Sequence, residues 1–187
     1  YRVARTAYNT LRAREKTRII VLGSNRWNAV DQLPALWIPE DRNTIITFHY
    51  YLPMLVTHCR ANWTDVGKYT GPVNYPGKPV SDVDFAALSP EIRKIVEPIN
   101  VHYDRDRILA DISTALAIRE KTGLPLYCGE FGVVHHCPDP IRHRWYRDFI
   151  SVLKENNIAW ANWDYKGSFA IWRDGKSTGI AEVMLGV

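Results

Sequence analysis

Four apolar segments of strand length recur along the chain, at residues 17–22, 44–51, 124–134 and 158–165. They read TRIIVL, TIITFHYY, LPLYCGEFGVV and IAWANWDY in that order. Each is rich in β-branched or aromatic residues and is bounded by polar or turn-forming positions. This pattern predicts four buried strands.

Segments with helical features lie between these strands. Asp104 can cap a helix over residues 104–121 that Gly123 ends, and Asp139-Pro140 marks the start of another. That second helix carries an apolar stripe of Trp145, Phe149, Val152 and Leu153. We also expect helices at residues 1–16, 30–37, 89–96 and 179–185.

The helices and strands alternate, and alternation of this kind predicts a parallel α/β sheet built from four βα units. We expect a single domain over residues 1–187, with a long loop at about 52–103 that is rich in Pro, Gly and Asn. Four βα units could form an open sheet. They are also half of an eight-stranded barrel, which usually needs about 250 residues.

Composition excludes several classes of protein. The 187 residues are 46% hydrophobic and 24% charged, as in a globular domain. No apolar run approaches the roughly 20 residues of a membrane helix. The net charge is +4, but Lys and Arg are spread among acids, so we expect neither nucleic acid nor membrane as a partner. The chain begins without Met or an apolar leader, so any signal peptide has been removed or lies outside it.

Polar and aromatic side chains gather at the ends of the predicted strands. Glu130 follows the third apolar run, and His49 and Tyr51 lie two residues apart on the second strand, so both point to one side. The fourth strand alternates Trp160, Asn162 and Asp164 on one face with Trp163 and Tyr165 on the other. Parallel sheets bind ligands at the carboxyl ends of their strands. Exposed aromatic rings there suit the C–H faces of sugars, whereas buried ones would only fill the core.

Other chemistries have weaker support. His135, His136, Cys137 and His143 have the residue types of a zinc site, but adjacent histidines diverge and the segment reads as a loop, so we expect no metal. No Gly-x-Ser-x-Gly elbow is present. The three cysteines form no disulfide framework, which leaves a Cys59–Cys137 bridge open and Cys128 as a buried small side chain.

Four motifs together resemble glycoside hydrolase family 5, the cellulase-like retaining glycosidases. TFHYYLP resembles the His-x-Tyr motif of the family's sixth strand, PLYCGEFGV the nucleophile motif of its seventh, and WANWDYKG the tryptophan motif of its eighth. TRIIVLGSNRWN resembles the fifth-strand segment. The resemblance implies strands five to eight of a (β/α)8 barrel, starting in the fourth helix, and therefore a half-barrel.

The resemblance also implies roles for individual residues. Glu130 would be the nucleophile, Tyr51 would orient it, and His49 would contact the sugar or tune the carboxylates. The expected substrate-binding residues are Trp163, Trp27, Asn28, Trp63 and Asp164. The implied activity is endo-acting, retaining hydrolysis of β-1,4-glucan without a cofactor, in a secreted protein.

One part of the family's pattern is missing. The family's acid/base is a Glu in an Asn-Glu-Pro segment after strand four, and no such segment occurs here. We therefore expect two copies to associate into a closed eight-stranded barrel, with Asp164 or Asn162 of one copy near the acid/base position of the other. The alternative is a catalytically inactive half-barrel that keeps a sugar-binding groove.

Overall fold

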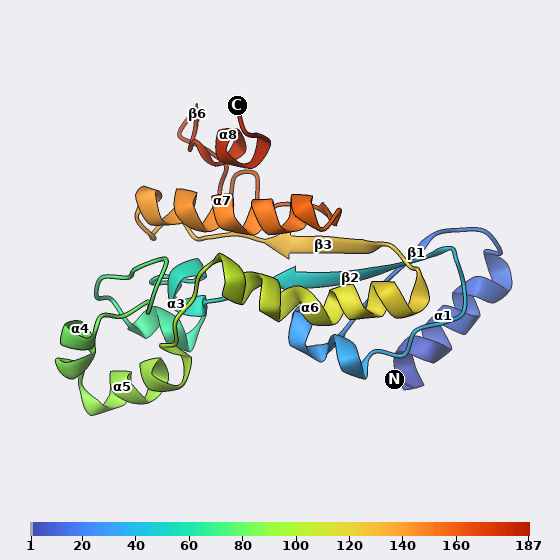
Figure 1. Ribbon diagram of the computed structural model, residues 1–187, viewed down its shortest axis with the longest axis horizontal. Coiled ribbons are helices and arrows are strands. Elements are labelled where there is room, and N and C mark those ends of the chain that lie inside the picture. The colour runs from blue at the N-terminus through green and yellow to red at the C-terminus, as the bar shows by residue number, and fades with distance from the viewer. Residues whose placement is uncertain (1) are drawn as a thin grey trace.

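The computed structural model describes residues 2–187 and contains a parallel sheet of four strands in the order β1-β2-β3-β4 (Figure 1). All three pairings are parallel, as the alternation of helices and strands predicted. The strands are β1 (Ile20–Gly23), β2 (Thr44–Tyr50), β3 (Leu126–Phe131) and β4 (Ala159–Trp160).

The two longest helices lie where the capping residues in the sequence predicted them. Helix α6 (Arg105–Thr122) begins after Asp104, whose carboxylate accepts a hydrogen bond from the Arg107 amide, and ends at left-handed Gly123. Helix α7 (Asp139–Glu155) has Pro140 in its first turn. Helices α1 (Arg2–Arg14) and α8 (Ile180–Leu185) also confirm the expectation.

The segment expected as a long loop contains five short helical turns, one of which matches the helix expected at residues 89–96. They are α3 (Met54–Thr57), η2 (Asp65–Lys68), α4 (Asp82–Ala86), α5 (Pro90–Val96) and η3 (Glu97–Ile99). Buried rings such as Tyr75, 2% exposed, anchor the segment on the core, and Asn100 hydrogen-bonds both the amide and the carbonyl of Val80. The other four turns could not be predicted, because each is too short to show a helical period.

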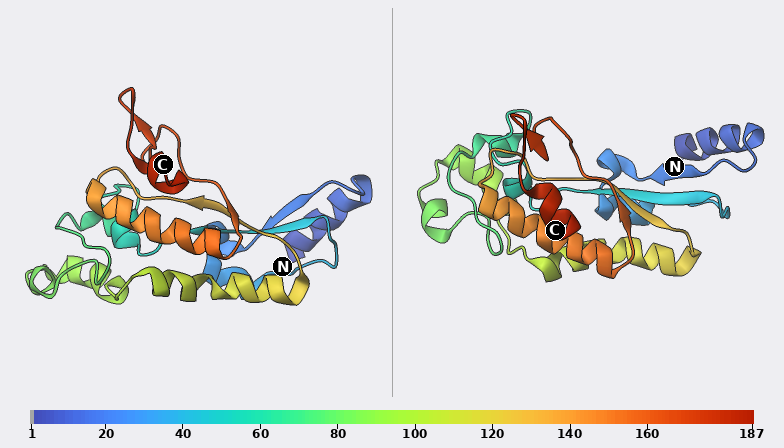
Figure 2. Two further views of the ribbon diagram at one scale, coloured as in Figure 1. Left: turned by 45° about the horizontal axis from the view of Figure 1, so that its top comes forward. Right: turned by 90° about the horizontal axis from the view of Figure 1, so that it is seen from above.

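Three further details differ from the expectation. The polar loop after β1 contains the turn α2 (Asn25–Asn28), and residues 30–37 form the 3-10 helix η1 (Val30–Ala35) rather than an α-helix. A hairpin of β5 (Trp172–Arg173) and β6 (Lys176–Ser177), unforeseen in the sequence, follows β4. Figure 2 shows the hairpin projecting beyond α8.

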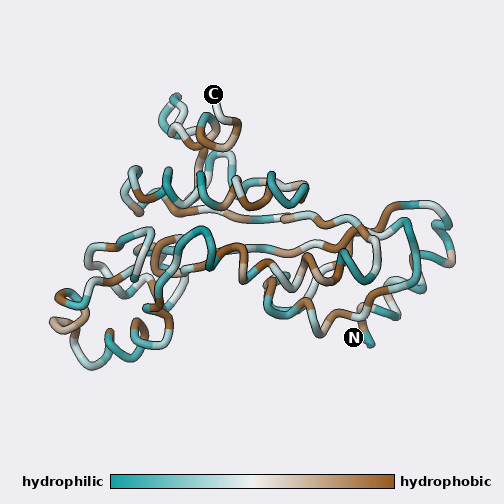
Figure 3. Tube along the Cα trace, in the orientation of Figure 1, coloured by the Kyte–Doolittle hydropathy of each residue, from teal (hydrophilic) through white to brown (hydrophobic). Residues whose placement is uncertain are grey.

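The core lies between the sheet and helices α6 and α7, which cover one face of it (Figures 1 and 2). Trp145 and Phe149 of α7 stack at 5.0 Å between ring centroids, and both are fully buried together with Phe131 of β3. Figure 3 shows hydrophobic residues following β2 and β3, whereas α1 is largely hydrophilic. Helix α7 therefore anchors the middle of the sheet.

The opposite face of the sheet and its two edges are open. Within residues 2–187, β1 and β4 each pair with a single strand. Val21 on β1 is 52% exposed and Ile19 just before it is 61% exposed. Apolar side chains at an unpaired edge mark a surface suited to further strand pairing.

Candidate active site

A bulge in β3 directs Glu130 onto the open face of the sheet. In the pairing with β2, Phe48 lies opposite Cys128 but His49 lies opposite Glu130, so Gly129 is an extra residue. Regular alternation would place Glu130 on the same side as the fully buried Cys128. The extra residue instead turns the Glu130 side chain outward, 34% exposed, and returns Phe131 to the core.

Tyr51 and His49 both contact the same oxygen of Glu130. The Tyr51 hydroxyl donates a hydrogen bond of 3.1 Å to Oε2, and His49 Nδ1 lies 3.4 Å from that atom. Burial, reinforced by the negative charge of Glu130, raises the pKa of Tyr51 far above its ordinary value, so the phenol keeps its proton and donates it. In the described part of the chain Oε1 has no hydrogen-bond partner, so it is the oxygen available for chemistry.

Asn28 sets the protonation of His49. Its Nδ2 lies 3.2 Å from His49 Nε2, and because an amide nitrogen can only donate, Nε2 accepts and the ring proton lies on Nδ1, facing Glu130. Burial lowers the pKa of His49, against the opposing effect of the Glu130 carboxylate. The imidazole is therefore neutral near pH 7, so its contact with Glu130 is not an ion pair.

Two glycines that the sequence reasoning missed make room for this arrangement. A Cβ at Gly23 would lie 2.0 Å from Asn28 Oδ1, and a Cβ at Gly129 would lie 2.8 Å from Thr47 Oγ1. Both distances are shorter than real Cβ contacts, so any other residue at either position would displace the side chain of Asn28 or Thr47. The signal available in the sequence was a glycine at a strand end next to a polar side chain.

The predicted tryptophans lie around the site at different places. Trp163 follows β4, is 47% exposed, and its amide donates to the Phe131 carbonyl beside Glu130. Trp27 is 89% exposed within a run of left-handed residues that also turns Asn28 toward His49. Trp63 is 53% exposed beside a pocket of about 470 Å³ lined by Asn62, Trp63, Thr64, Asp65, Gly67 and Lys68.

Phe169 and His58, which sequence reasoning did not single out, connect Trp63 to the Glu130 site. Phe169 lies 5.7 Å from Tyr51 and 6.3 Å from Trp63 between ring centroids, and His58 lies edge-on to all three rings. Burial lowers the pKa of His58 to about 4, so this ring acts as a neutral packing element. A continuous aromatic wall therefore runs from Tyr51 to Trp63.

Asp164 occupies a turn. Its Oδ1 accepts a hydrogen bond of 2.8 Å from the Gly167 amide. Beyond the end of β4, Ala161 bonds to Cys128 and Trp163 to Phe131, so two steps along this segment match three along β3, as the extra residue Gly129 requires.

The cysteines and histidines of the other candidate chemistries are engaged elsewhere. All three cysteines are free thiols, and a hydrogen bond between Cys59 and Cys137 lowers the pKa of Cys59 and raises that of Cys137. His135 Nδ1 bonds the Ser168 carbonyl and His143 Nε2 lies 3.2 Å from the Thr178 carbonyl. Across residues 2–187 no group of three or more potential metal ligands forms.

The site thus presents a carboxylate with one restrained and one available oxygen at the C-terminal edge of a parallel α/β sheet, near exposed tryptophans. Residues 1–168 match the Cellulase family, glycosyl hydrolase family 5, and the chain belongs to that family.

Two curated relatives agree with this membership. The chain is 33% identical to Endoglucanase C of Acetivibrio thermocellus over 157 residues, covering 83% of this chain and 46% of the relative. It is 28% identical to Cellodextrinase A of Ruminococcus flavefaciens over 141 residues, covering 75% of this chain and 35% of the relative. The chain thus spans less than half the length of either relative.

Among solved structures, the endoglucanase Cel5A of Thermotoga maritima superposes with a TM-score of 0.73 at 21% identity, covering 97% of this chain and 51% of that one. A cellulose synthase subunit Z from Clostridioides difficile gives 0.75 at 20% identity, covering 96% and 53%. The fold therefore corresponds to about half of such a (β/α)8 enzyme.

Proposed function

We propose that this chain forms part of an endo-acting, retaining β-1,4-glucan hydrolase in which Glu130 is the nucleophile. The observation that carries the proposal is the restraint of Oε2 by Tyr51 and His49, which leaves Oε1 for attack. The names of the endoglucanase relatives support a β-glucan as the substrate.

In the first step, Oε1 attacks the anomeric carbon and forms a glycosyl ester as the leaving oxygen departs. Tyr51 and the Nδ1–H of His49 stabilise the carboxylate before attack and orient it. A second carboxyl group about 5–5.5 Å away must protonate the leaving oxygen and then activate water. Trp163, Trp27 and Trp63 supply stacking surfaces, and the aromatic wall from Tyr51 to Trp63 gives the length that a polymer chain needs.

The test of this activity uses hydroxyethyl cellulose and a soluble cello-oligosaccharide. Endo action predicts that viscosity falls early, while few reducing ends have formed. Retention predicts that the first product seen by proton NMR is the β-anomer, before mutarotation. An α-anomer as first product overturns the retaining mechanism, and binding of the polymer without any turnover would favour the inactive sugar-binding alternative.

We further propose that two copies of this chain associate through the open edges of their sheets. The exposed Ile19 and Val21 at the β1 edge would be buried, and β4 of one copy would lie beside β1 of the other. Asp164 and Asn162 of the second copy would then approach the acid/base position. Of these two side chains only Asp164 can donate a proton, and it would have to leave its hydrogen bond with Gly167.

Light scattering during size-exclusion chromatography tests the association. At micromolar concentration we expect twice the 21.5 kDa mass of the chain. Val21→Lys places a charge at the proposed contact and should shift the protein to a monomer, whereas Val83→Lys, at an exposed position on α4, should leave it a dimer. A wild-type monomer, or a dimer insensitive to Val21→Lys, would contradict closure of the barrel.

No helix within the described residues has the length and apolarity to span a membrane. We propose that the enzyme acts outside the cell, because an insoluble or polymeric glucan does not cross a membrane.

A further inference from the structure

A second pocket lies at the same end of the sheet as Glu130, between the segments that follow β3 and β4. It has a volume of about 470 Å³ and is lined by His135, Lys166, Gly167, Trp172, Arg173, Asp174 and Gly175. None of these residues belongs to the arrangement around Glu130. Like the pocket beside Trp63, it combines a tryptophan with a lysine and an aspartate, but of the two pockets only this one contains an arginine.

The charge of this pocket is predominantly positive. Lys166 and Arg173 contribute permanent positive charges, against the single carboxylate of Asp174. Asp174 approaches only Nε of Arg173, at 3.6 Å, and its own side chain is 90% exposed. The two terminal nitrogens of the guanidinium therefore remain available to a ligand, in the fork geometry that matches a carboxylate.

The positive charges near the pocket also affect His136, the residue after His135. Burial is the largest cause that lowers the pKa of His136; the neighbouring Arg173 and Arg60 side chains lower it further, against the opposing effect of a hydrogen bond with the Arg60 main chain. Arg60 comes from the segment after α3, whereas Lys166 and Arg173 follow β4, so permanent positive charges from two segments lie near His136 and the pocket. A ligand carboxylate in this field would be stabilised.

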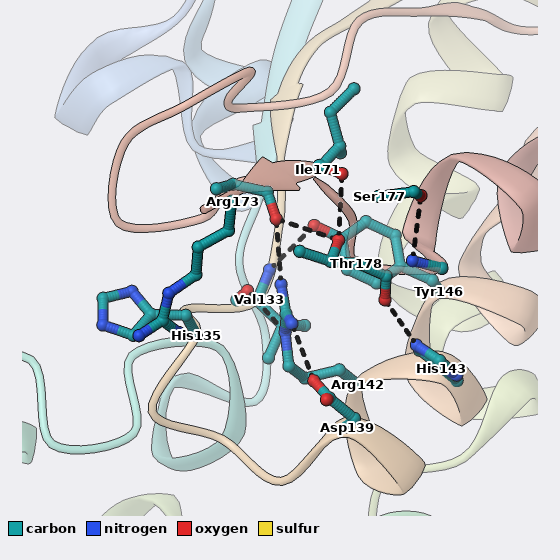
Figure 4. A network of polar contacts seen from close by, with 12 residues as sticks. Val133, His135, Asp139, Arg142, His143, Tyr146, Ile171, Arg173, Ser177 and Thr178 are labelled. Carbon is teal, nitrogen blue, oxygen red and sulfur yellow. Dashed lines mark hydrogen bonds and ion pairs between the residues drawn. The ribbon is translucent and has the colours of Figure 1, made fainter. Parts of the chain in front are cut away.

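The pocket walls are held in place by a buried arginine. Arg142 of α7, 2% exposed, donates from Nε to the Val133 carbonyl and from Nη2 to the Ala170 carbonyl, and pairs with Asp139 through Nη1. The amide and Nδ1 of His135 both bond the Ser168 carbonyl. Figure 4 shows Arg142 within this network and the Arg173 side chain extending toward His135. The two loops are thereby fixed to each other before any ligand binds.

The pocket lies beside the proposed cleft and not at the bond that is cleaved. The Trp163 amide donates to the Phe131 carbonyl, next to Glu130. Further along, the His135 amide donates to the Ser168 carbonyl. Three residues lie between Phe131 and His135, so their Cα atoms are at most roughly 14 Å apart. Trp172 is 40% exposed at the pocket and offers a face on which a sugar ring can stack.

From this geometry we infer that the pocket binds a carboxylate-bearing sugar unit of the polysaccharide, with Arg173 and Lys166 on the carboxylate and Trp172 against the ring. The inference rests on the proposed glucan-cleaving function and narrows its substrate to chains with acidic groups at some distance from the cleaved bond. Neutral cellulose would occupy the cleft without using this pocket.

The test compares binding of two soluble celluloses of similar chain length, neutral hydroxyethyl cellulose and anionic carboxymethyl cellulose, by affinity electrophoresis at low ionic strength. The proteins compared are wild type, the pocket variant Lys166→Gln/Arg173→Gln, and the control variant Lys94→Gln/Lys154→Gln. The control removes the same net charge at exposed positions on α5 and α7.

Wild type should bind the anionic polymer about fivefold tighter than the neutral one, and the control variant should keep that ratio. The pocket variant should bind both polymers within about twofold of each other, with unchanged affinity for the neutral polymer. Added salt at about 0.5 M should reduce the wild-type ratio toward one. Equal ratios in the pocket and control variants would show a non-specific charge effect and overturn the site.

The two proposals fail differently. If no variant binds or cleaves the neutral polymer, the glucan cleft is contradicted, while a preference for the anionic polymer lost only in the pocket variant would still support the pocket. If the neutral polymer is bound and cleaved and the preference is absent in wild type, the pocket is contradicted and the cleft stands.

Discussion

Replacing Glu130 with glutamine is expected to lower the rate of glucan hydrolysis at least about a thousandfold while leaving glucan binding intact. Glutamine has nearly the same shape as glutamate and can still accept a hydrogen bond from Tyr51. Its neutral amide cannot form the glycosyl ester through which the proposed mechanism passes. Initial rates on hydroxyethyl cellulose, with binding measured by affinity electrophoresis, separate the two effects.

Glu120→Gln is the matched control, because Glu120 is an exposed residue in the last turn of α6, before β3 begins, whereas Glu130 lies near the opposite end of that strand. It should retain the wild-type rate, and all three proteins should have the same circular dichroism spectrum and unfolding midpoint. A Glu130→Gln protein that keeps more than about one-tenth of the wild-type rate would remove Glu130 from the role of nucleophile.

Replacing Trp145 with alanine is expected to destabilise the fold by about 3–5 kcal/mol. Trp145 is fully buried, stacks on Phe149 at 5.0 Å, and its Nε1 donates a hydrogen bond of 2.9 Å to the Leu52 carbonyl. The substitution therefore leaves a cavity and an unpaired buried carbonyl. Because Leu52 directly follows Tyr51, we also expect the position of Tyr51 beside Glu130 to loosen. Urea unfolding followed by circular dichroism measures the loss.

Two comparison variants make this result specific. Trp145→Phe keeps an aromatic ring but lacks the donor, so it should cost less than the alanine variant, about 1–3 kcal/mol. Trp27→Ala removes a ring that is 89% exposed and should change the free energy of unfolding by less than about 0.5 kcal/mol. Equal losses for Trp145→Ala and Trp27→Ala would contradict the packing of α7 on the sheet.

Much of the architecture could be predicted because its signals are local. Asp104 and Gly123 bound α6 as their capping chemistry required, and the stripe from Trp145 to Leu153 is buried as its spacing indicated. The segment at residues 52–103 could not be predicted in the same way. Its short turns are stabilised by contacts with distant residues, such as the hydrogen bond from Tyr75 to Asp148 of α7.

The sequence by itself determined the alternation of strands and helices, the parallel sheet, and the residues that meet at its edge: His49, Tyr51 and Glu130. These follow from hydrophobic periodicity and from the strand positions of single side chains.

The direction in which the Glu130 side chain points depends on the tertiary structure. Strict alternation would have placed it on the side of buried Cys128, and the bulge at Gly129 turns it to the open face opposite His49. A bulge depends on the pairing of β3 with its neighbours and has no periodic signal along the chain. The tautomer of His49, set by Asn28 from another strand's loop, is likewise a property of packing rather than of sequence spacing.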